Sequence, residues 1–196
     1  MTGEKSKEII LKAAEESASL RKISAEHLST PLVELANLIS GVIGSGGKIL
    51  ICGNGGSAGD SSHMATELIV RLNSSRNRQS LPAIALNADT SILTAAGNDF
   101  GFENIFSRQV EGLGRRGDIL LLISTSGNSA NLVRAAEVAK NMGLFVAALL
   151  GGDGGKLKGM VNRSLIVPHH SVQRIQEEHI FLIHLLVELI ESDLFR

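Results

Sequence analysis

The chain has 196 residues, 20% of them charged, and a formal net charge of −1, which suits one globular domain without a general attraction to nucleic acid. Aromatic residues make up only 3%, with no Trp and no Tyr, which argues against a base-stacking surface. The chain has a single cysteine, Cys52, and no signal-peptide pattern follows Met1. No apolar run approaches the roughly 20 residues of a membrane span, so we expect a cytoplasmic protein without membrane contact.

The first 46 residues are helical in pattern and carry almost no strand signal. Two apolar stripes at helical spacing occur between residues 4 and 42. Pro31 falls near the start of the second stripe, where proline is tolerated or introduces a kink. We therefore expect two long helices in residues 1–46 as an N-terminal extension that contacts other subunits. The stripes comprise Ile9, Ile10, Ala13, Ala14 and Leu20, and then Leu28, Leu32, Leu35, Ile39 and Val42.

Residues 47–196 predict an α/β core. The apolar runs are continuous rather than alternating, as expected for strands that are covered on both faces, and helical patterns separate them. This order predicts a three-layer α/β/α fold with a five-stranded parallel sheet, in which ligands bind beyond the carboxyl ends of the strands. Residues 73–80 read as a mobile loop. The expected strands are 48–52, 81–86, 118–123, 144–149 and 164–167, and the expected helices include 58–71, 131–142 and 172–192.

Two loops join an expected strand to an expected helix and suit an anion. Loop 53–58 (Gly-Asn-Gly-Gly-Ser-Ala) can turn backbone N–H groups toward a phosphate at a helix N-terminus, although it could also be a tight turn without a ligand. It matches a dinucleotide fingerprint, but residues 72–80 lack the acid that would hold a ribose, so we expect no nucleotide cofactor. Loop 124–129 (Ser-Thr-Ser-Gly-Asn-Ser) offers four hydroxyls for a phosphate monoester, while capping by Ser129 explains only one of them.

The side chains suited to acid–base or metal chemistry lie on two expected helices. His63 and Glu67 are four residues apart and share a helical face, either as functional groups or as an ordinary surface pair. On the last helix, His179 falls in a polar stretch and should face solvent. His184 falls in an apolar run, where a histidine is more often a satisfied core residue than a ligand.

A further motif, Asn98-Asp99, closes a short expected helix after the second strand. These side chains could bind hydroxyls of a polyol, or they could form an ordinary helix C-terminal turn. His169 and His170 follow Pro168 in a loop, and the sequence assigns them no role.

Six motifs in this order resemble the sugar isomerase (SIS) domain family, and within it the bacterial isomerases of seven-carbon sugar phosphates. The resemblance runs from about residue 47 to the C-terminus, and the helical N-terminus also fits. It implies a flavodoxin-like sheet and a homotetramer with active sites between subunits. The motifs are residues 52–57, His63-x-x-x-Glu67, 97–101, 124–129, 153–155 and 174–177.

The resemblance further implies a reaction and a set of site residues. The reaction is conversion of sedoheptulose 7-phosphate to D-glycero-D-manno-heptose 7-phosphate, the first step toward ADP-heptose for lipopolysaccharide core or related glycans. The resemblance implies zinc held by residues matching His63, Glu67, Gln176 and His184. Substrate contacts would come from Asn54, Gly55, Gly56, Glu67, Asn98, Asp99, Ser124, Thr125, Ser126, Ser129 and Gln176.

Ketose–aldose interconversion suits these residue types, because it moves a proton between adjacent carbons and needs a base, an acid and a group that polarises the carbonyl. Our hypothesis is Glu67 as the base and His184 as its acid/base partner. Gln176 and His184 are eight residues apart, about 12 Å along an ideal helix, so both reach one ion only across subunits or from a bent helix. The alternative function is a noncatalytic SIS scaffold that binds the replication initiator. Such relatives lack equivalents of Glu67 and His184 and carry Arg at Ser126.

Overall fold

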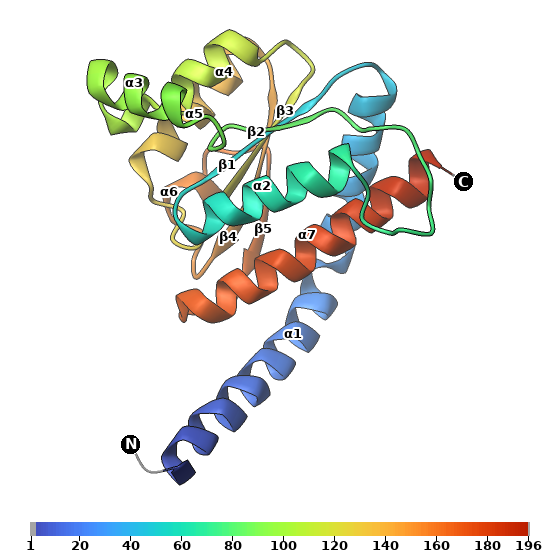
Figure 1. The fold of residues 1–196 in the computed structure, drawn as a ribbon, viewed down its shortest axis with the longest axis vertical. Coiled ribbons are helices and arrows are strands. Elements are labelled where there is room, and N and C mark those ends of the chain that lie inside the picture. Colours follow the sequence, from blue (N-terminus) through green and yellow to red (C-terminus); the bar gives the residue numbers. More distant parts are fainter. Residues whose placement is uncertain (1–2, 196) are drawn as a thin grey trace.

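The computed structural model describes residues 3–195 and has five strands in one sheet (Figure 1). All neighbouring strands pair in parallel, in the order β2-β1-β3-β4-β5, which confirms the predicted α/β class. Its elements are α1 (Gly3–Gly44), β1 (Ile49–Gly53), α2 (Gly56–Ile69), β2 (Ala83–Ala85), α3 (Thr90–Phe100), η1 (Phe102–Asn104), α4 (Ser107–Leu113), β3 (Ile119–Ser124), α5 (Ala130–Met142), β4 (Phe145–Gly151), α6 (Gly155–Lys158), β5 (Arg163–Val167) and α7 (Val172–Leu194).

The central strands β1 and β3 are buried along their whole length, which is why their sequences are continuously apolar. Successive side chains point to opposite faces and enter two separate cores. On β3, Leu121 packs with α1, α2 and α7, whereas Leu120 and Leu122 pack with α4, α5 and α6. The three layers that the sequence predicted therefore follow from two helical layers on one doubly covered sheet.

The N-terminal segment forms one helix, not the two that we expected from the sequence. α1 continues through Pro31 without a break. No glycine or proline lies between Leu20 and Leu28 that could end a first helix, and Leu28 and Leu32 on either side of Pro31 both pack into the core. Burial on both sides of the proline thus offsets the loss of one backbone hydrogen bond, about 3 kcal/mol or more in a helix interior.

The first half of α1 extends away from the sheet as an arm (Figure 1). Its residues Ile9, Ile10 and Leu11 are 58–67% exposed, and the buried residues of the helix begin only at Leu20. Because these apolar side chains remain exposed to water, they contribute little hydrophobic stabilisation to the protomer. Among the described residues, none of the helices is long and apolar enough to cross a membrane.

α7 packs across one face of the sheet and is anchored to β4 by His179, which the sequence wrongly placed in solvent. His179 is fully buried, and its Nε2 lies 3.1 Å from the carbonyl oxygen of Leu150. The ring therefore donates to the backbone near the carboxyl end of β4. Nδ1 has no hydrogen-bond partner within residues 3–195. Burial lowers the pKa of His179 from 6.5 to about 4, so the ring is neutral at pH 7.

This buried ring makes stability depend on pH. The unfolded chain binds a proton at His179 below about pH 6.5 and the folded chain does not, so stability falls as pH decreases from 6.5 toward 4. We expect His179 to remove about 2 kcal/mol of stability between pH 7.5 and pH 5. His179→Gln keeps a donor but cannot titrate, so its stability deficit at pH 7.5 should shrink at pH 5. Urea unfolding at fixed protein concentration measures this difference, and an unchanged deficit would contradict the assignment.

Candidate active site

The acid–base residues meet where α2 and α7 cross. His63 and Glu67 lie one turn apart on α2, with 3.6 Å between Nε2 of His63 and Oε1 of Glu67. Nε2 of His184 on α7 lies 2.8 Å from the same His63 nitrogen, so one ring donates an N–H to the other. All three side chains are partly exposed. His184 is therefore not an ordinary core histidine, and the structure brings it and Glu67 to the same nitrogen of His63.

The sequence reasoning missed a second carboxyl, Asp60, one turn before His63 on the same helix. Asp60 is buried, and its Oδ2 has no hydrogen-bond partner in the described part of the chain. Burial raises the pKa of Asp60 to about 6, and the nearby His63 opposes this shift. Its spacing of three residues from His63 was the available signal, because residues three and four apart share a helical face.

The two glycine- and serine-rich loops lie side by side, as strands β1 and β3 pair directly. Asn54 in the first loop and Asn131 at the start of α5 exchange two hydrogen bonds of 2.9 Å between their amide groups. The first loop bends sharply at Gly55, whose φ of 55° is rarely adopted by other residues. The reciprocal amide pair fixes the two loops relative to each other at the carboxyl edge of the sheet.

The second loop is braced from within, yet it leaves hydroxyls free for a ligand. Ser124 Oγ accepts from the N–H of Gly127, and Ser126 Oγ accepts from the N–H of Asn128. Ser129 occupies the N-cap position of α5, but in the described structure its side chain makes no capping hydrogen bond. The hydroxyl of Ser129 and the N-terminus of a 13-residue helix are thus both available to an anion.

Gln176 lies at the other end of α2 from Glu67. A Cβ atom on Gly56 would collide with the amide of Gln176, so this side chain sits against the first residue of α2. His63 follows Gly56 by seven residues, about 10 Å along a helix. Within one protomer, the structure therefore brings together three of the four expected metal ligands and leaves Gln176 nearer the first glycine-rich loop.

Asn98 and Asp99 are exposed in the last turn of α3, which Figure 1 shows well away from α7. Asn98 donates to Oδ1 of Asp99 at 2.8 Å. The neighbouring Phe100 and Phe102 are 51% and 64% exposed. The protomer does not bring this predicted substrate-binding pair to the His63 cluster.

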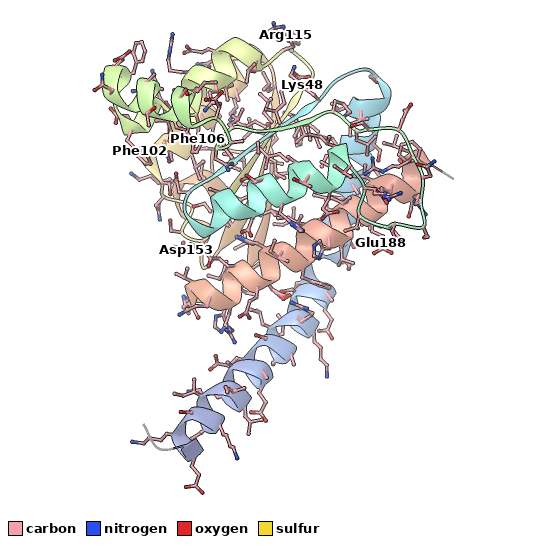
Figure 2. The ribbon with its side chains drawn as sticks, viewed as in Figure 1. Lys48, Phe102, Phe106, Arg115, Asp153 and Glu188 are labelled. Atoms are coloured by element: carbon pink, nitrogen blue, oxygen red, sulfur yellow. The ribbon has the colours of Figure 1, made fainter. Side chains whose placement is uncertain are left out.

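A cavity of about 380 Å³ opens beside the second loop. Asp153, which Figure 2 places near the start of α7, is one of the residues that line this cavity. Nδ1 of His169 accepts from the N–H of Ser171, so its Nε2 carries the proton of the neutral ring. Our reading of the sequence assigned no role to His169 and His170, because no spacing signal connects them with residues 124–129. The lining residues are Thr125, Ser126, Gly151, Gly152, Asp153, His169, His170, Val172 and Ile175.

The donor set of His63, Glu67 and His184 suits zinc, which binds imidazole nitrogen and carboxylate oxygen. The two ring nitrogens already face one another at 2.8 Å. Even so, no three His, Cys, Asp or Glu side chains in residues 3–195 stand in the arrangement of a formed metal site. The chemistry of these residues fits the ion, and binding would require the side chains to reorient.

A family model described as the SIS domain matches residues 13–151, and the chain belongs to this family. Phosphoheptose isomerase from Chlorobium phaeobacteroides is 50% identical over 185 residues, which cover 94% of this chain and 82% of that protein. The solved phosphoheptose isomerase from Neisseria gonorrhoeae is 44% identical, with a TM-score of 0.90 over 95% of this chain and 98% of that one. The one from Francisella tularensis is 37% identical, with a TM-score of 0.92 over 98% and 100%. Within the SIS family, the chain is thus a member of the phosphoheptose isomerases.

Gly127 provides a direct test of the second loop. Its φ is 63°, and an added Cβ would collide with the carbonyl of Gly154, so Gly127→Ala must displace the loop. Strain of about 1–3 kcal/mol at such a position should weaken sugar-phosphate binding by roughly 10-fold or more, as measured by titration calorimetry. Gly112→Ala on α4 is the matched control, because nothing lies within 4 Å of its added Cβ. Equal affinity for both variants would show that the loop does not hold the phosphate.

Proposed function

We propose that this protein converts sedoheptulose 7-phosphate to D-glycero-D-manno-heptose 7-phosphate in the cytoplasm, as the first step toward ADP-heptose for lipopolysaccharide core or related glycans. The observation that carries the proposal is the cluster of His63, Glu67 and His184, in a chain 50% identical to a phosphoheptose isomerase. The paired phosphate loops and that relative's name together favour a phosphorylated sugar as substrate. The noncatalytic scaffold is not favoured, because this chain has Glu67, His184 and Ser126.

In the proposed reaction, the second loop and the N-terminus of α5 hold the phosphate and thereby fix the reacting end of the ketose. Glu67 removes a proton from C1, and the electron pair moves into the C1–C2 bond while the C2 carbonyl oxygen gains a proton. The resulting enediol loses the proton on O1, and Glu67 returns a proton to C2, so no net oxidation occurs. His184 supplies the proton to O2 and accepts the one from O1, and His63 orients both partners.

A substitution at Glu67 tests the base. Glu67→Gln keeps the size of the side chain but removes its basicity, so kcat should fall by about 10²- to 10⁴-fold while sugar-phosphate binding persists. Glu137→Gln, a change at an exposed position of α5, is the control. The assay follows formation of the aldose 7-phosphate from sedoheptulose 7-phosphate. A Glu67→Gln rate within a few fold of the parent rules out this assignment, and an inactive parent rules out the reaction itself.

We also propose that the site holds one zinc ion per subunit, through His63, Glu67, His184 and Gln176. Bound zinc would polarise the carbonyl and stabilise the enediolate. Support comes from the nitrogen and oxygen donors at the crossing of α2 and α7. Because Gln176 lies at the other end of α2 in the protomer, its participation needs a side-chain shift or a second subunit.

Metal content tests this proposal independently of turnover. The purified protein should contain about one zinc per subunit by mass spectrometry, and chelation should lower its Tm, because an ion that binds only the folded state stabilises it. His63→Ala should lose the ion, whereas His27→Ala, a change at an exposed position of α1, should retain it. A metal-free parent, or equal zinc content in both variants, would contradict the assignment.

We further propose a homotetramer with active sites at subunit interfaces. The exposed arm of α1 and the exposed Phe100 and Phe102 beside Asn98 would be covered by neighbouring subunits. A groove of about 410 Å³ between α1 and α7 supports the same assembly, because it is lined mainly by apolar side chains such as Leu28 and Phe181. Assembly would also supply Asn98 and Asp99 to a site from which they are remote in the protomer.

A further inference from the structure

The last turn of α2, which carries Glu67, ends without the usual glycine. Its C-cap residue is Val70, with φ −92° and ψ −80°, so the final carbonyls of the helix need other donors. The N–H of Val70 bonds to the carbonyl of Thr66 at 2.8 Å, and Ser80 Oγ donates to the carbonyl of Ile69 at 2.7 Å. The two carbonyls between them belong to Glu67 and Leu68.

Arg78, in the loop that follows α2, supplies the donor for Glu67 and a second donor for Leu68, whose carbonyl also accepts from the N–H of Leu81 at 3.1 Å. Its Nη2 donates to the carbonyl oxygen of Glu67 at 2.7 Å, and its Nη1 donates to that of Leu68 at 2.8 Å. Figure 1 shows this loop folding back past the C-terminal end of α7. A guanidinium at this place also meets the partial negative charge of the helix C-terminus. The rigid fork of arginine can hold two successive carbonyls, whereas the single ammonium of lysine lacks that shape.

The same guanidinium is tied to α7. Nε of Arg78 lies 2.6 Å from Oε1 of Glu191, and the two side chains are only 1% and 3% exposed. Glu191 follows His184 by seven residues, so both lie on the face of α7 that meets α2. Two polar contacts therefore join these helices: His63 with His184 in the site, and Arg78 with Glu191 two turns farther along.

We propose that Arg78 is a positioning residue for the isomerase reaction: held by Glu191, it fixes the last turn of α2 and so sets the Glu67 carboxylate against His184. This inference rests on the proposed role of Glu67 as the base. Arg78 touches the backbone of Glu67 and not the reacting atoms, so its effect passes through the placement of that carboxylate. The phosphate loops follow β1 and β3 at the opposite end of α2, and Arg78 leaves them undisturbed.

Arg78→Lys is the decisive variant, because it keeps the buried charge for Glu191 but loses the two-carbonyl fork. We expect kcat for sedoheptulose 7-phosphate to fall roughly 10- to 100-fold, since a misplacement of about 1 Å at a catalytic group has an effect of this size. KM should stay within about threefold of the parent, because phosphate binding is unchanged. Steady-state kinetics on protein of parent-like circular dichroism and oligomeric state measures this split.

Glu178→Gln is the matched control, and Glu191→Gln is the second test. Both glutamates are buried on α7 and accept from an arginine Nε, at 3.0 Å from Arg21 and 2.6 Å from Arg78. Glu191→Gln should lower kcat with little change in KM, whereas Glu178→Gln should lose stability at parent kcat. Glu191→Gln decides by the same criterion if Arg78→Lys does not fold.

Three results overturn the proposal. The first is a folded Arg78→Lys variant with the kcat of the parent. The second is a Glu178→Gln variant that loses as much kcat as Arg78→Lys does, and the third is an Arg78→Lys variant whose KM rises while its kcat stays that of the parent. Failure of the underlying function is distinct, because it appears as an inactive parent enzyme. Failure of the base assignment appears as a Glu67→Gln enzyme with parent turnover, and the role of Arg78 then falls with it.

Discussion

The 2.8 Å contact between the ring nitrogens of His63 and His184 joins residues 121 positions apart, and the candidate site depends on it. In a parallel sheet, loops at the carboxyl edge gather by topology alone, because every strand ends on the same side. Helix-borne groups gather only if the helices cross at a defined place. The α2–α7 crossing is therefore the constraint that brings three separate side chains into one cluster.

Several contacts fix the position of α7 where it crosses α2. His179 anchors α7 to the backbone of β4, and a Cβ on Gly151 would meet Cδ1 of Ile175 at 2.6 Å, so α7 approaches the end of β4 as closely as side chains allow. Gln176 lies as tightly over Gly56. These contacts leave α7 little freedom to slide, which matters because displacement along the helix axis would separate His184 from His63.

Much of the fold was predictable because doubly covered strands leave continuous apolar runs in the sequence. The helical pattern also placed the start of the last helix at residue 172, where α7 begins. The shared face of His63 and Glu67 followed from helical spacing. The partner of His63 did not, since nothing local records which helix crosses α2. His179 was misjudged for a related reason: its polar sequence neighbours, such as Glu177, face away, and burial depends on the strand beneath. Pro31 was overweighted because packing on both sides outweighs a local propensity.

The Arg78–Glu191 pair illustrates that a buried ion pair can have a role other than stabilising the fold. Removing two ions from water costs several kcal/mol each, and well-packed apolar residues often stabilise a fold as well as such a pair does. Apolar side chains, however, cannot donate a hydrogen bond to the carbonyl of Glu67, which would then lack a partner at a helix end without a glycine cap, and Leu68 would keep only the N–H of Leu81. The pair defines a direction and a register for the last turn of α2. In the reaction that we propose, that geometry would set where the Glu67 carboxylate lies relative to His184.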